Sequence, residues 1–125
     1  MVTRALFDVI KVDYSPPDRT ASSANPIIPM YAGDLILAAY VIPIVLGTTA
    51  NTVTLGITGE IARFTASYDT STGTVGTPID GTTAIFPDPA LADQNLIVDY
   101  IVAAGGGTIT PKTRFVVVIL RAPRF

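Results

Sequence analysis

The chain has 125 residues, of which 49% are hydrophobic and only 14% are charged, and its formal net charge is −2. This length suits one domain with its own core, and the small negative charge excludes a strong electrostatic attraction to nucleic acid or to an anionic membrane. The chain contains neither Cys nor His, which excludes disulfides, thiolate metal sites and nucleophiles activated by His.

The first predicted element is a strand at Arg4–Tyr14, where β-branched and aromatic residues dominate. Met1–Tyr14 also lacks the apolar segment of a signal peptide, which predicts synthesis in a cytoplasm.

A segment rich in proline, Ser15–Pro29, follows, and its four prolines favour an extended chain over a helix. Two interpretations stay open: a surface loop, or an arm that lies on a neighbouring molecule. In the second case the contacts with the partner would come from Pro16, Pro17, Asp18, Arg19, Ile27, Ile28 and Met30.

The longest apolar run is Leu35–Leu46, which is too short for a bilayer because a spanning helix needs roughly 20 residues. Pro43 and several β-branched residues favour a strand. Strict alternation would place Leu35, Leu37, Ala39, Val41 and Val45 on one face, and Ile36, Ala38, Tyr40, Ile42, Ile44 and Leu46 on the other. Neither face is polar, so we expect both to be covered, one of them by another subunit.

Thr52–Thr58 alternates apolar and polar residues, as a half-buried strand does. Its short separation from Leu35–Leu46 predicts an antiparallel hairpin of these two strands. Ile61–Tyr68 is either a further short strand or an irregular crossing. Asp69–Thr83 is predicted to be a long exposed loop or a loose hairpin around Val75–Ile79.

A turn is expected at Pro87–Asp93, with Asp88 capping one helical turn. Two strands then close the chain, Asn95–Ala103 and Arg114–Arg121, and we expect a Gly-rich hairpin loop between them. No segment has a helical period. The sequence therefore predicts a single all-β domain over residues 1–125, an antiparallel β-sandwich of jelly-roll type with about six to eight strands.

Catalytic and metal sites are poorly supported by the sequence. The carboxylates mostly stand beside turn-forming residues, and neither the pair Asp88 and Asp93 nor the pair Asp69 and Asp80 has the spacing of a calcium loop. We expect no enzyme activity, no cofactor and no metal. Asp99 interrupts an apolar strand, and it either guards a sheet edge or pairs with Arg63, Arg114 or Arg121.

Two further patterns do not indicate a binding site. Gly105-Gly106-Gly107-Thr108 lacks the lysine spacing and the helix of a phosphate-binding loop. The basic residues near the C-terminus have no stacking aromatics among them, which favours a solvated edge or an interface fringe over a nucleic-acid site.

Three stretches together resemble small structural proteins of tailed bacteriophages: GDLILAAYVIPIV, NTVTLGITGEIARF and NLIVDYIVAAGGGTITPKTRFVVVILRAP. The resemblance covers roughly Gly33–Pro123. It implies a protein of the virion, such as a capsid decoration (cement) protein, a head fibre or a tail-associated part.

From the resemblance and the low charge fraction we expect a decoration protein that forms a homo-oligomer, a trimer, and stabilises an icosahedral phage head. Its partners would be further copies of itself and the major capsid protein or another virion protein, without nucleic acid or membrane. The alternatives are a tail, neck or head-fibre component and, from another class, a carbohydrate- or surface-binding module. The expected oligomer interface is Tyr40, Ile42, Ile44, Tyr100, Val116 and Val118.

Overall fold

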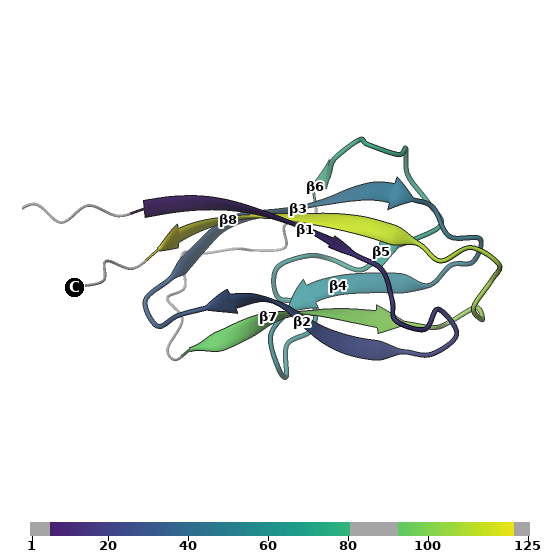
Figure 1. The fold of residues 1–125 in the computed structure, drawn as a ribbon, viewed down its shortest axis with the longest axis horizontal. Coiled ribbons are helices and arrows are strands. Elements are labelled where there is room, and N and C mark those ends of the chain that lie inside the picture. The colour runs from purple at the N-terminus through teal and green to yellow at the C-terminus, as the bar shows by residue number, and fades with distance from the viewer. Residues whose placement is uncertain (1–5, 81–92, 122–125) are drawn as a thin grey trace, which may run out of the picture.

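A computed structural model describes residues 6–80 and 93–121 of the chain. All regular elements of this part of the chain are strands (Figure 1). They are β1 (Leu6–Tyr14), β2 (Ser23–Met30), β3 (Leu35–Val45), β4 (Thr52–Gly56), β5 (Tyr68–Asp69), β6 (Ile79–Asp80), β7 (Gln94–Ile101) and β8 (Lys112–Arg121). In the described ranges no helix is long and apolar enough to span a membrane. The predicted all-β class is confirmed.

The strands form two antiparallel four-stranded sheets. Sheet A has the order β1-β8-β3-β6, and sheet B has the order β2-β7-β4-β5. Strand β1 pairs with β8, β2 with β7, β3 with β6 and β4 with β5, as in one long hairpin that has been rolled up. The roll adds the pairs β3·β8 and β4·β7. This order is that of a jelly roll, and the predicted β-sandwich is confirmed.

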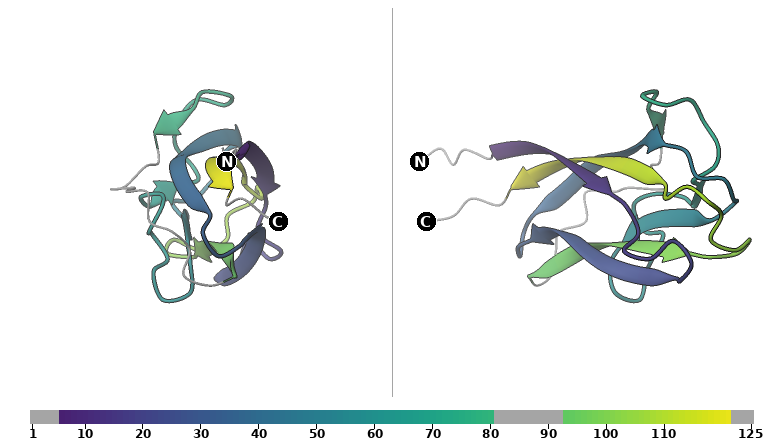
Figure 2. Two further views of the ribbon diagram at one scale, coloured as in Figure 1. Left: turned by 90° about the vertical axis from the view of Figure 1, so that its left-hand side faces the viewer. Right: turned by 45° about the vertical axis from the view of Figure 1, so that its right-hand side comes forward.

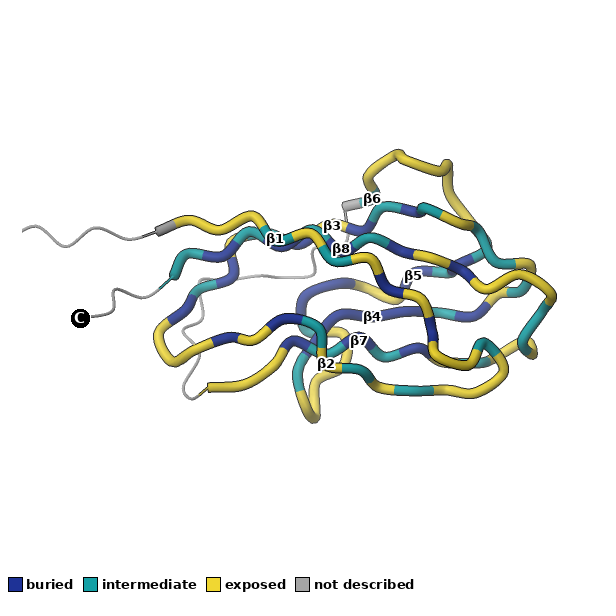
Figure 3. The backbone as a smooth tube through the Cα atoms, viewed as in Figure 1, coloured by how far each residue is buried: buried dark blue, intermediate teal, exposed yellow. Residues whose placement is uncertain are grey.

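The core lies between the two sheets (Figure 3). Sheet A contributes mainly β-branched and aromatic side chains from its central strands, and sheet B contributes the inward residues of β2, β4 and β7. The largest fully buried apolar side chains are Tyr100, Phe115, Ile28, Leu55, Leu96, Ile119, Val41, Val53, Val98 and Val117.

Both hairpins expected from sequence proximity are wrong. Strand β3 lies in sheet A and β4 in sheet B, and β7 and β8 are divided in the same way. The intervening loops, 46–51 and 102–111, therefore cross from one sheet to the other at one end of the sandwich (Figure 1). Apolar patterns define which face of a strand is buried, but they do not identify its neighbour in the sheet.

A bulge in β3 changes which of its residues face the core. The register against β8 shifts between Ile36 and Ala38, so that Ile36, Ala39 and Val41 are all buried. The extra residue reverses the alternation. The predicted division of faces is therefore wrong before the bulge and right between Ala39 and Ile42.

The middle of the chain is mostly irregular. Of the two alternatives for Ile61–Tyr68, the structure shows the irregular crossing, and β5 begins only at Tyr68. The loop between β5 and β6 is largely exposed, as expected. The turn expected at Pro87–Asp93 lies outside the described residues except for Asp93.

Candidate docking face and loop network

The outward side of sheet A, called the outer face below, is the strongest candidate for a functional surface. Residues that stand directly opposite each other in antiparallel strands point to the same side. The registers of β1, β8 and β3 thus place four rows on the outer face: Phe7, Leu120 and Leu35; Val9, Val118 and Ala38; Lys11, Val116 and Tyr40; Asp13, Arg114 and Ile42.

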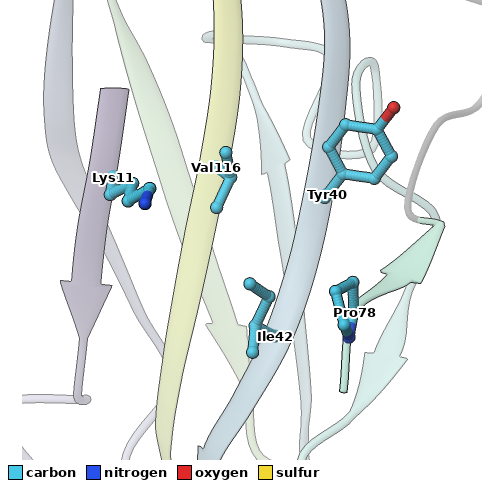
Figure 4. Close-up of a pocket in the computed structure, with 5 residues that line it drawn as sticks. All are labelled: Lys11, Tyr40, Ile42, Pro78 and Val116. Carbon is cyan, nitrogen blue, oxygen red and sulfur yellow. The ribbon is translucent and has the colours of Figure 1, made fainter. Parts of the chain in front are cut away.

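Most of these side chains are apolar, and several are open to solvent. Phe7 is 66% exposed, Val9 60% and Tyr40 38%. On the outer face lies a shallow hollow of about 300 Å³, lined by Lys11, Tyr40, Ile42, Pro78 and Val116 (Figure 4). Figure 4 shows that the residues lining the hollow come from β1, β8 and β3 and from the position before β6. An exposed apolar patch of this kind is typical of an interaction surface.

The structure brings together four of the residues predicted to form an oligomer interface. Tyr40, Ile42, Val116 and Val118 all lie on the outer face. Ile44 is half-buried beside the second register shift of β3. That these residues contact a partner stays a prediction. Phe7 and Val9 were missed, because Asp8 and Lys11 interrupt the apolar pattern of β1.

Tyr100 cannot belong to such an interface, because it is 1% exposed. It stands on β7 in sheet B and points into the sandwich. Its hydroxyl donates to the carbonyl of Arg19 (2.9 Å) and accepts from Asn51 Nδ2 (3.0 Å). The alternation along β7 contains this information, since Asp99 faces outward and its neighbour must then face inward.

Asn51 is the centre of the loop network at this end. It is 1% exposed, and its Oδ1 accepts from the backbone N–H groups of Ala103 (2.9 Å) and Ala104 (3.1 Å). Its Nδ2 also donates to Thr49 Oγ1 and to the carbonyl of Gly105. The side-chain amide of Asn51 thus joins loops 46–51 and 102–111, the two loops that were predicted to be hairpin turns.

The glycines of the β7–β8 loop allow the neighbouring loops to pack closely. A Cβ on Gly106 would lie 2.6 Å from Thr20 Cγ2, and one on Gly107 would collide with Thr48 Oγ1. Gly107 also has a positive φ of 66°. The Gly-rich segment therefore lets three loops pack against one another. These are the β1–β2, β3–β4 and β7–β8 loops, which lie at the same end of the sandwich (Figure 2).

The expected docking arm is largely part of the sandwich itself. Ile28 and Met30 are 1% and 3% exposed on β2, so they fill the core and cannot supply the expected contact with a partner. Pro16 is buried and Pro17 is exposed. Ile27 is half-buried and packs against the core. The prolines did not prevent sheet formation, because β2 is an edge strand, where proline is tolerated.

The tip of the same segment is held by its own chain. Arg19 Nε donates to the carbonyl of Gly107 (3.1 Å), and Asp18 Oδ1 accepts from the N–H and the hydroxyl of Thr20. The two hydrogen bonds from Thr20 lower the pKa of Asp18. Asp18 is exposed, and its expected contact with a partner stays a prediction.

Ion pairs lie at the opposite end of the sandwich and on the outer face. Arg121 lies 2.7 Å from the fully buried Asp34 and 2.9 Å from Asp8, and it also donates to the carbonyl of Pro29. Burial alone lowers the pKa of Arg121, but its hydrogen bonds to Asp8 and Asp34 outweigh this and raise it. On the outer face, a hydrogen bond from Arg114 lowers the pKa of Asp13.

Asp99 takes neither of its expected roles. It stands on β7, an interior strand of sheet B, so it guards no edge. Arg114 and Arg121 pair instead with Asp13, Asp8 and Asp34, and Arg63 with Glu60. Burial raises the pKa of Asp99.

Two further carboxylates accept hydrogen bonds from backbone N–H groups. Asp69 caps Ser71, and Asp93 accepts from the N–H of Ala32. Asp88, one of the two residues of the weak calcium pattern, lies outside the described residues. Within residues 6–80 and 93–121, no group of three potential ligands could hold a metal ion.

Comparison with solved structures finds a likeness to a chain of the capsid asymmetric unit of cyanophage Pam1, with a TM-score of 0.63 and 15% sequence identity. The match covers 96% of this chain and 86% of that chain, so the two are of similar length and share the fold over most of it. In sequence comparisons, no family model and no curated protein matches the chain.

Proposed function

We propose that the chain is a structural protein of a phage virion. The observation that carries the proposal is an apolar outer face on a jelly roll whose fold matches a chain of a phage capsid over almost its whole length. The low charge fraction, 14%, supports the same role, since much of the surface of an assembly protein is covered by its neighbours.

Within the virion, we propose that the chain decorates the outside of an icosahedral head. The outer face then packs against the shell protein, and the burial of apolar area strengthens the shell. A standard interface buries roughly 1,600 Å², just over half of it apolar, which at about 25 cal/mol per Å² is on the order of 20 kcal/mol before association costs. This role is mechanical and requires no catalytic group, cofactor or metal.

Binding of the purified chain to particles that lack it tests the proposal. In the variant Tyr40→Glu a charge would enter the middle of the contact, and we expect the affinity to fall by about tenfold or more. Ile101→Glu is the matched control, because Ile101 is equally exposed, at 38%, but lies on β7 in sheet B.

Co-sedimentation at graded protein concentration measures both affinities, and circular dichroism verifies folding. Equal binding of the folded Tyr40→Glu variant and the wild type would show that the outer face is not the attachment surface. Absence of binding by the wild type would count against decoration itself.

A further inference from the structure

The four sheet edges of the sandwich are not alike. An exposed strand edge offers unpaired N–H and C=O groups to any other strand, and proteins protect such edges with short strands, prolines or bulges. Three of the four edges carry these devices. In the described residues β5 and β6 are each two residues long, and β2 carries Pro26, Pro29 and a register shift between Pro26 and Ile28.

Strand β1 is the exception, because charged side chains are its only protection of this kind. It has nine residues, no proline and an unbroken register against β8. Among the described residues no strand pairs with its second edge. Its outward side chains include the two most exposed large hydrophobic residues of the described chain, Phe7 and Val9. Its inward charge, Asp8, is held in an ion pair by Arg121 of its own chain, an arginine that it shares with Asp34.

We propose that the edge of β1 pairs antiparallel with β1 of a second copy, so that two copies share one continuous sheet. Among the described residues β1 is the one long edge strand without a proline or a register shift, and this favours the arrangement. Two open edges would permit head-to-tail addition without end, whereas one edge can only meet itself across a two-fold axis, which closes the assembly. The sequence alone predicts a trimer, but the distribution of edges favours a pair as the unit.

The residues of β1 are compatible with self-pairing centred on Val9. In that register Val9 faces Val9 of the second copy, and Phe7 faces Lys11. The first is a favourable β-branched pair, and the second allows an ammonium group to approach an aromatic ring. No like charges stand opposite each other, because Asp8 faces Ile10. The shared sheet also joins the two outer faces into one apolar surface.

The proposal names the self-association partner of the proposed virion protein, but its test needs no particle. Light scattering coupled to size exclusion should give twice the chain mass of 13.1 kDa. Val9→Lys places two lysines opposite each other, and we expect the mass to fall twofold, to that of one chain. Ile101→Lys, on the interior strand β7, should keep the doubled mass. Circular dichroism verifies folding of both variants.

Cysteine cross-linking gives a second test that tolerates a milder change, because the native chain has no cysteine. Val9→Cys should form a disulfide-linked pair under mild oxidation, and Ile101→Cys should remain a single chain. A monomeric or trimeric wild type, or equal cross-linking of the two variants, would overturn the pair.

Failure of the pair and failure of the proposed function are distinguishable. A monomer that still attaches to particles overturns only the pair. A dimer that is absent from particles overturns only the virion role.

Discussion

At the scale of single residues, Asp99 combines partial burial with the absence of any of its expected arginine partners. It faces Ala24 and Thr54 on the neighbouring strands of sheet B, and the Thr54 hydroxyl beside it is buried without a hydrogen-bond partner in the described structure. Burial raises the pKa of Asp99 above its ordinary value of 3.8. The folded chain therefore binds this proton more tightly than the unfolded chain does.

This pKa shift predicts a pH dependence with a definite sign. Below the unfolded pKa both states are protonated and the site costs no stability. As the pH rises through the higher folded pKa, the charged form is penalised in the folded state, and stability falls. We expect Asp99→Asn to raise Tm at neutral pH. The gain in the free energy of unfolding should stay below about 1 kcal/mol, because solvent still screens the carboxylate. The difference in Tm between this variant and the wild type should become smaller as the pH falls. A pH-independent difference in thermal unfolding scans would contradict this.

At the scale of elements, β2 shows why the segment rich in proline belongs to the fold. Ile28 is 1% exposed and stands opposite Leu96 on β7. Ile28→Ala should cost about 2–5 kcal/mol of unfolding free energy, the usual range for a buried isoleucine. Ile101→Ala is the matched control on an exposed site and should cost less than about 1 kcal/mol.

Chemical denaturation measures both variants. If Ile28→Ala unfolded at the same denaturant concentration as the wild type, the proline-rich segment would lie on the sandwich without being part of its core. Replacement of Pro16–Ile28 by a flexible linker, which would be harmless if the segment were an arm, should instead unfold the chain.

Most of the long strands were predictable, whereas β2 and the pairing partners of the strands were not. β3, β4, β7 and β8 all lie where runs of β-branched residues predict them, because such side chains suit a pleated, buried surface. Pairing depends on where each loop leads, and loops 46–51 and 102–111 are fixed by the side chain of Asn51, whose contacts come from distant parts of the chain.

At the scale of the whole molecule, the two apolar faces of β3 and β8 are the part of the candidate site that the sequence revealed. One face fills the core and the other forms the outer face with Tyr40, Val116 and Val118. The contribution of β1 could not be foreseen, since Phe7 and Val9 reach the same surface only through the pairing of the first and last strands.

The copy number of the chain in purified particles tests the central claim most directly. Quantitative mass spectrometry of particles from the virus that encodes the chain compares it with the shell protein. We predict a copy number of the same order as that of the shell protein, because decoration covers the whole head. A few copies per particle would assign the chain to the tail, neck or a fibre and contradict decoration. Absence from purified particles would contradict the virion role altogether.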